Sequence, residues 1–175
     1  FCWGEIEECG KDPLENARQK ALAYYRICGQ PVFSQDSGLY IEGLPKERQP
    51  GVHVRRVNGV NLTDEQMRKY YKKIAAEFGG RCVAQYQNAI CLVFSENEIY
   101  EARGGALNWK KFWLMTEERP QRMEGFPLDA ICADYRTGRH FYDGEATMPE
   151  EEGDGVRDFF RNALKLHEMR NKIEK

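Results

Sequence analysis

Apolar residues first recur at helical spacing, in steps of three and four, at Leu14, Ala17, Ala21, Leu22 and Tyr25. This spacing gives one apolar face and predicts a helix. Asp12 is a typical helix cap, Pro13 fits the first helical position, and Gly29 and Pro31 are stop signals. The sequence therefore predicts a helix that ends shortly before position 29.

A short run of strand formers follows this helix. Val32–Ser34 predicts a strand, Gln35–Gly38 predicts an interruption, and the apolar pattern resumes at Leu39. A helix, a short loop and a strand in this order indicate an α/β unit.

A second helix is predicted from Thr63, which forms a capping box with Gln66. Its apolar stripe consists of Met67, Tyr70, Tyr71, Ile74 and Phe78. Before it, residues 45–61 read as a loop, and residues 1–9 as a strand or an extended arm.

The middle of the chain is rich in strand formers. Cys82–Phe94 and Glu98–Arg103 flank a short polar connection and predict a hairpin, and Lys110–Met115 and Ala130–Ala133 predict two further strands. Residues 150–154 read as an acidic loop.

The end of the chain predicts a last helix, over Val156–Ile173. We expect one of its sides to be buried through Val156, Phe159, Phe160, Ala163, Leu164 and Leu166.

Composition places this pattern in a globular chain. Of the 175 residues, 41% are hydrophobic and 31% are charged, which argues against disorder. A net charge of −2 predicts no nucleic-acid partner, and no apolar run or leader pattern predicts a membrane partner. The six scattered cysteines predict free thiols in a reducing compartment, hence a cytoplasmic location.

Two carboxylates are the candidates for chemistry. Glu15 lies in the first turn of the first helix, and Asp36 lies just past the predicted strand end. The chain reverses between them, so both are expected at one edge of the sheet, where they could hold Mg²⁺ on a phosphate or activate a water. The alternative interpretation is structural: Glu15 favours the helix dipole, and Asp36 forms a turn.

Three segments together resemble the inosine triphosphate pyrophosphatase family, which hydrolyses non-canonical purine nucleoside triphosphates. These are DPLENARQKA, PVFSQDSGLYIEGL and QPGVHVRR, and they occur in the family's order and spacing. The resemblance implies an α/β fold with an elongated mixed sheet flanked by helices, and two lobes around a central cleft, over a single domain of residues 1–175. It also implies a homodimer.

The resemblance also implies roles for individual residues. Glu15 and Asp36 would bind Mg²⁺ and carry catalysis on a nucleoside triphosphate such as ITP, dITP or XTP. The residues expected to bind substrate are Lys20, Ser37, Gly38, Arg55, Phe126 and Asp129. Of these, Phe126 would stack on the base, although a core aromatic is the equal alternative.

The chain departs from the family pattern in three ways. The family's opening strand, phosphate loop and first helix have no counterpart after Phe1, so we expect the domain to lack them. Gln35 stands where the family has an acid, and no Ser-His-Arg motif precedes the last helix. Arg157, Arg161 or a surface His140 are the candidates to replace that motif.

These departures leave three hypotheses. The first is a Mg²⁺-dependent pyrophosphatase. The second is a weakened or inactive nucleotide-binding relative with a regulatory role. The third is an interaction module that shares only the architecture, because a fold does not fix a function.

Overall fold

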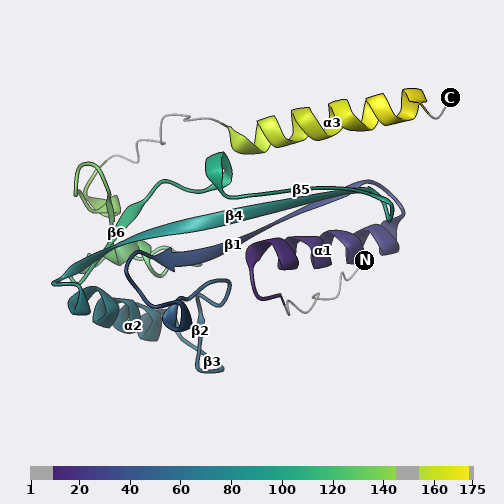
Figure 1. Cartoon of the computed structure of the whole chain (residues 1–175). Coiled ribbons are helices and arrows are strands. Elements are labelled where there is room, and N and C mark those ends of the chain that lie inside the picture. The colour runs from purple at the N-terminus through teal and green to yellow at the C-terminus, as the bar shows by residue number, and fades with distance from the viewer. Residues whose placement is uncertain (1–9, 145–153, 174–175) are drawn as a thin grey trace. The chain divides into compact units, whose positions relative to one another are not determined.

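The computed structural model describes residues 10–144 and 154–173 (Figure 1). Its helices are α1 (Pro13–Cys28), α2 (Asp64–Glu77) and α3 (Gly155–Ile173). Its strands are β1 (Val32–Ile41), β2 (Arg56–Val57), β3 (Val60–Asn61), β4 (Arg81–Ser95), β5 (Glu98–Arg103), β6 (Phe112–Met115) and β7 (Cys132–Asp134). The predicted arm over residues 1–9 and most of the predicted acidic loop lie outside the described residues.

The main sheet has the order β1-β4-β6-β7. The first residues of β4, Arg81–Ala84, pair with β6, and its later residues, Ala89–Ser95, pair with β5. The pairs β4–β5, β4–β6 and β6–β7 are all antiparallel. Leu92 lies opposite Tyr100 in the β4–β5 hairpin, which confirms the predicted hairpin. A chain that combines this sheet with three helices among its described residues confirms the predicted α/β class.

The chain divides into two compact units. The first comprises the described residues up to Gly38, together with Gln87–Asn108 and α3; the second comprises Leu39–Tyr86 and the described residues from Trp109 to Gly144. Strands β1 and β4 contribute residues to both units. The cleft predicted between two lobes stays a prediction.

Helix α1 begins and ends where the sequence predicts. The Asp12 carboxylate accepts hydrogen bonds from the backbone N–H groups of Leu14 and Glu15, at 2.9 and 3.0 Å. At the other end Gly29 has a φ of 61°, and its N–H donates to the Tyr25 carbonyl. A left-handed residue is the usual end of a helix, and glycine adopts it without strain.

The core of the first unit lies between α1 and the β4–β5 hairpin. Ala17 and Ala21 have no exposed surface, and they pack with Cys91 and Val93 of β4. Two alanines on one helix face allow the helix axis to approach the sheet closely.

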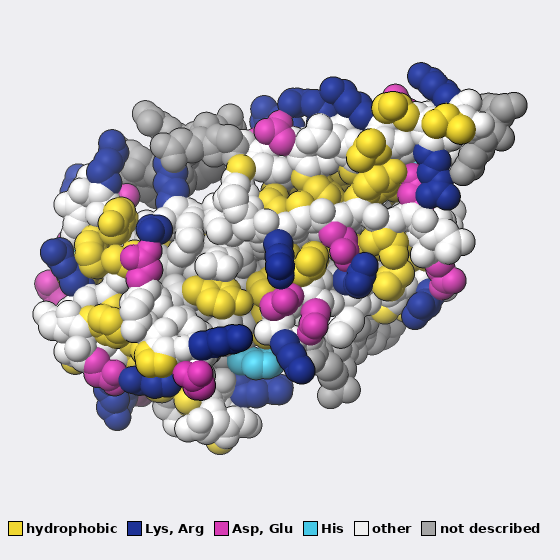
Figure 2. Space-filling view, in the orientation of Figure 1, with side chains coloured by type: hydrophobic (Ala, Val, Ile, Leu, Met, Phe, Trp, Pro, Cys, Tyr) yellow, Lys and Arg dark blue, Asp and Glu magenta, His cyan; other side chains and the backbone are white. Residues whose placement is uncertain are grey.

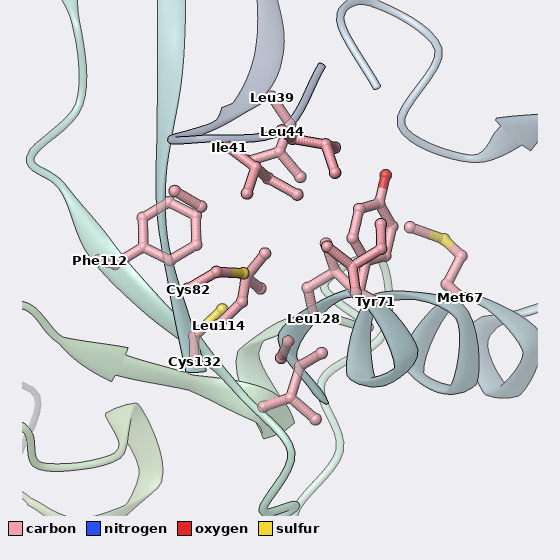
Figure 3. Close-up of a cluster of buried hydrophobic side chains, with 14 residues drawn as sticks. Leu39, Ile41, Leu44, Met67, Tyr71, Cys82, Phe112, Leu114, Leu128 and Cys132 are labelled. Atoms are coloured by element: carbon pink, nitrogen blue, oxygen red, sulfur yellow. The ribbon is translucent and has the colours of Figure 1, made fainter. Parts of the chain in front are cut away.

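The core of the second unit packs α2 against β4, β6 and β7 (Figure 3). Its largest fully buried side chain is Tyr71 of α2, whose hydroxyl donates to the Val54 carbonyl at 2.8 Å. Burial raises the pKa of this phenol. The predicted capping box of Thr63 and Gln66 is present at the start of α2 and is confirmed.

The interruption predicted at Gln35–Gly38 is wrong, because β1 runs through these residues. The strand continues through these residues, so Asp36 lies inside it and not past its end. The side chains alternate between the two faces, and the strand tolerates the polar residues because its first half is only partly buried.

A small hairpin of β2 and β3 replaces part of the loop predicted over residues 45–61. Asn58 and Gly59 connect the two strands with φ values of 50° and 79°. An Asn-Gly pair is the usual sequence of such a turn, and it was the overlooked signal.

Helix α3 also differs from its prediction. Ala163 is buried, but Leu164 and Leu166 are 48% and 52% exposed. The apolar residues of this helix extend around more of its circumference than the sheet covers. Among the described residues, no helix combines the length and the apolar character needed to cross a membrane.

Candidate functional site

The alternation of β1 decides which side chains face α1. Phe33 and Ser37 contact Phe160 of α3 and Asn88 of β4, respectively. Asp36 lies on the opposite face of the strand and contacts α1. Gln35 shares the parity of Phe33 and Ser37, so the missing acid at this position lies on the face away from Asp36.

Asp36 is held by two side chains of α1. Its Oδ1 accepts a hydrogen bond from Lys20 Nζ at 2.9 Å, and its Oδ2 accepts one from Asn16 Nδ2 at 3.0 Å. The Lys20 and Asp36 side chains are only 18% and 13% exposed, so the ion pair is largely shielded from solvent. We call Asn16, Lys20 and Asp36 the carboxylate clamp.

Asn16 is the member of the clamp that the sequence analysis missed. It is 1% exposed, and its Oδ1 accepts a hydrogen bond from the Gly10 N–H at 2.8 Å. A Cβ added at Gly10 would lie 2.4 Å from that Oδ1, so the contact requires glycine. The sequence held one signal for this role, a polar residue among the apolar positions of α1. A polar side chain is buried at such a place only when it has hydrogen-bond partners.

Glu15 is exposed in the first turn of α1. Its Oε2 accepts a hydrogen bond from the Lys11 N–H at 2.7 Å. Over the described residues, no group of three or more His, Cys, Asp or Glu side chains is arranged to hold a metal. The Mg²⁺ site expected at Glu15 and Asp36 stays a prediction; Mg²⁺ binds one or two carboxylates and takes its remaining ligands from water and phosphate.

Ser37 and Gly38 belong to the strand that carries Asp36. The Ser37 hydroxyl donates to Asn88 Oδ1 at 2.7 Å, and Asn88 Nδ2 donates to the Leu107 carbonyl at 2.6 Å. Asn88 is 6% exposed, and it ties β1 to the segment after β5. Gly38 is buried in the strand.

The other predicted substrate residues belong to the second unit. Arg55 is exposed and pairs with Asp64 at 2.8 Å, Phe126 is 56% exposed, and Asp129 is half-buried. Burial raises the pKa of the Asp129 carboxyl. Phe126 is therefore not the core aromatic of the alternative interpretation, and its exposed ring is free to stack on a flat ligand.

The candidates to replace the Ser-His-Arg motif occupy other roles. Arg157 pairs with Asp154 at 3.1 Å and Arg161 with Asp158 at 2.8 Å, each on the surface of α3. His140 was expected at the surface but is only 5% exposed, which corrects that prediction. Its backbone bridges to Ala133 of β7.

Comparisons with known proteins identify relatives of the chain. The sequence model of the Ham1 family matches residues 1–108. A dITP/XTP pyrophosphatase of Brucella melitensis is 31% identical over 160 residues, covering 85% of this chain and 66% of the relative. One of Prochlorococcus marinus is 32% identical over 130 residues, covering 73% and 59%. One of Malacoplasma penetrans is 33% identical over 103 residues, and the match covers 50% of that relative.

Solved structures show the same fold. A HAM1 protein from Coxiella burnetii is 25% identical, with a TM-score of 0.68 over 94% of this chain and 81% of that one. The Ham1 protein of Staphylococcus aureus, at 23% identity, has a TM-score of 0.62 over 98% and 82%. The chain thus matches these structures over most of its length but spans only about half to two thirds of the curated relatives.

Proposed function

Because the chain belongs to the Ham1 family, as the resemblance to inosine triphosphate pyrophosphatases predicted, we propose that it hydrolyses non-canonical purine nucleoside triphosphates. The proposed substrates are of the ITP, dITP and XTP type, and the products are the nucleoside monophosphate and pyrophosphate. The named activity of the Brucella and Prochlorococcus relatives supports this proposal.

The carboxylate clamp carries the proposal. Asp36 is a largely shielded carboxylate whose two oxygens are fixed by Asn16 and Lys20. A catalytic carboxylate has to be positioned in advance, because a misplaced group loses much of its effect on the rate. The clamp positions Asp36 with two side chains of α1, a helix whose N-terminus is capped by Asp12.

In the proposed reaction a water oxygen forms a bond to the α-phosphorus. The bond from that phosphorus to the oxygen bridging to the β-phosphorus breaks, and pyrophosphate leaves with the electron pair. Asp36 accepts the proton of the water, and Lys20 balances negative charge beside it. Ser37, Gly38 and Arg55 are proposed to bind the substrate, with Phe126 against the base and Asp129 orienting it.

Glu15 and Asp36 are the residues that would hold Mg²⁺. The ion would supply charge neutralisation for the triphosphate. Glu15 Oε2 and both Asp36 oxygens already accept one hydrogen bond each, and a carboxylate oxygen has a second lone pair to offer. A homodimer, which the resemblance implies, and a cytoplasmic location, which the cysteine usage indicates, complete the proposal.

A nucleotide panel tests this function. Pyrophosphate release is measured from dITP, XTP, ATP and GTP with Mg²⁺ and with a chelator. We expect release from dITP and XTP well above that from ATP and GTP, and its loss in chelator. Equal rates for all four nucleotides, or no release from any, would contradict the proposed substrate class.

The ion pair within the clamp favours a second candidate, a nucleotide-binding relative that does not turn over. Lys20 neutralises the charge of Asp36, and both arginines that could replace the missing motif pair with an aspartate three residues before them in the chain. Calorimetry decides between the two functions: heat of binding for dITP without pyrophosphate release would support this second candidate.

A further inference from the structure

Arg55 lies in a short bend of the chain over residues 53–56, which we call the arginine bend. The Arg56 N–H donates to the His53 carbonyl at 3.0 Å and closes the bend. The Arg55 carbonyl accepts a hydrogen bond from the Leu62 N–H at 2.9 Å. These backbone bonds join residues that are close in sequence, so they give the bend its shape but do not join it to the core of the second unit.

The segment before the arginine bend is fastened to the end of β1. Gln49 uses its side-chain amide like a peptide group: Oε1 accepts a hydrogen bond from the Ile41 N–H at 2.8 Å, and Nε2 donates to the Ile41 carbonyl at 2.7 Å. Gly51 exchanges two backbone hydrogen bonds with Leu39, at 2.9 and 3.0 Å. The chain therefore enters the bend from a fixed start, and the position of Arg55 depends on what holds the bend itself.

Tyr71 of α2 connects the arginine bend with the core. Its side chain is fully buried, its hydroxyl donates to the Val54 carbonyl at 2.8 Å, and Val54 packs against the same cluster of buried side chains. Figure 3 shows this hydroxyl at the end of the ring that lies away from α2. A buried hydroxyl costs free energy unless it is hydrogen-bonded, so the bond to Val54 is firmly set. A phenylalanine would fill the same space but would not hold the carbonyl.

The carbonyl that Tyr71 holds belongs to the peptide group between Val54 and Arg55. Because a peptide group is planar and rigid, a rotation of this group would move the Cα of Arg55. The Arg55 guanidinium donates through Nη1 to the Leu62 carbonyl at 3.0 Å, and Nη1 lies 2.8 Å from Asp64 Oδ1. Arg55 directly precedes β2, and Figure 2 shows basic and acidic side chains on this part of the surface. A guanidinium binds a phosphate group through a planar fork, so its affinity depends on its orientation.

We propose that Tyr71 is a positioning residue for substrate binding. By holding the Val54 carbonyl, its hydroxyl keeps the arginine bend, and with it the Arg55 guanidinium, in the orientation that receives the phosphate groups of the substrate. The inference rests on the proposed function, in which Arg55 binds the substrate. It concerns affinity and not the chemical step, because the triphosphate carries its charge before the reaction as well as during it.

The test compares two neighbouring tyrosines of α2. Tyr71→Phe keeps the ring and removes the hydroxyl, and we expect it to raise the KM for dITP at least about fivefold while kcat changes by less than about twofold. Tyr70→Phe is the matched control: the Tyr70 ring packs edge-to-face on Tyr71, with 5.2 Å between the ring centroids, and the substitution should leave KM unchanged. A purely structural loss would instead reduce the folded fraction, which lowers the apparent kcat and leaves KM as it is.

A double-mutant cycle with Arg55→Ala shows whether Tyr71 acts through Arg55. Arg55→Ala should raise KM, and adding Tyr71→Phe to it should raise KM no further. An unchanged KM in Tyr71→Phe, or the same fold increase with and without Arg55, overturns the positioning role alone. If the wild type binds dITP without turnover, Kd values from calorimetry take the place of KM in each comparison. A wild type that neither hydrolyses nor binds dITP contradicts the proposed function and the positioning role together.

Discussion

At the scale of single residues, the candidate site depends on one buried amide. Asn16 offers its oxygen to the Gly10 N–H and its NH₂ group to Asp36, so a single side chain connects the loop before α1 with β1. Asn16 makes both hydrogen bonds with a neutral amide group. The amide therefore orients Asp36 while Lys20 compensates its charge.

Asn16→Ala should lower the free energy of unfolding by about 1–3 kcal/mol, because it leaves the buried Gly10 N–H and one Asp36 oxygen without partners. Urea denaturation measures the change. Asn162→Ala, at an exposed position of α3, is the control and should change stability by less than about 0.5 kcal/mol. Equal effects of the two substitutions would show that the clamp contributes nothing.

The sequence predicted Asp36 and Lys20 as site residues but not their contact. The contact depends on β1 continuing as a regular strand, since only then does Asp36 face α1 while Ser37 faces Asn88. A Gln-Asp-Ser-Gly run reads locally as a turn, and tertiary packing overrides that preference. The role of Asn16 was missed for a related reason: its burial depends on partners distant in sequence.

At the scale of elements, the end of α3 is fastened to the β4–β5 hairpin by a polar cluster. His167 Nδ1 lies 2.9 Å from Glu98 Oε1, and the Tyr100 hydroxyl donates to the same oxygen at 2.8 Å. Burial of Glu98 raises the pKa of its carboxyl, but the hydrogen bonds from His167 and Tyr100 outweigh it, and the net pKa is lowered.

This lowered pKa predicts how stability depends on pH. The unfolded pKa of a glutamate is about 4.3. A carboxyl whose pKa is lower than this in the folded state stabilises the fold at pH values above about 4.3. This stabilisation is lost as the pH falls through the folded pKa. Urea denaturation should therefore show the advantage of the wild type over Glu98→Gln shrinking as the pH falls below about 4. A constant difference from neutral to acid pH would contradict the assignment.

The elements themselves were largely predictable, because their signals are local. The Asp12 cap, the Thr63 capping box and the polar turn of the β4–β5 hairpin all lie where the sequence indicates. The exposure of Leu166 was not predictable. Periodicity finds the apolar residues of a helix, but it does not tell how many of them a sheet will cover.

At the scale of the whole molecule, each compact unit has a hydrophobic core of its own. The core of the second unit joins distant segments through strand pairing: Leu114 of β6 lies between Cys82 of β4 and Cys132 of β7. Burial raises the pKa of the Cys82 thiol to about 11, so this thiol stays protonated and packs as a small apolar group.

Leu114→Ala should lower the free energy of unfolding by about 2–5 kcal/mol, because it opens a cavity among three strands. Leu164→Ala is the matched control: the same substitution at a position 48% exposed should cost much less. Urea denaturation of the two variants makes the comparison, and a similar loss in both would mean that the second core does not hold this unit together.

The central claim is that the Asp36 carboxylate drives hydrolysis of a nucleoside triphosphate, and one rate comparison tests it most directly. Pyrophosphate release from dITP with Mg²⁺ is measured for the wild type and for Asp36→Asn, which keeps the size of the side chain and removes its charge. We predict that the substitution lowers kcat by at least about 100-fold while the chain stays folded. Release by a folded Asp36→Asn variant at the wild-type rate would contradict the claim.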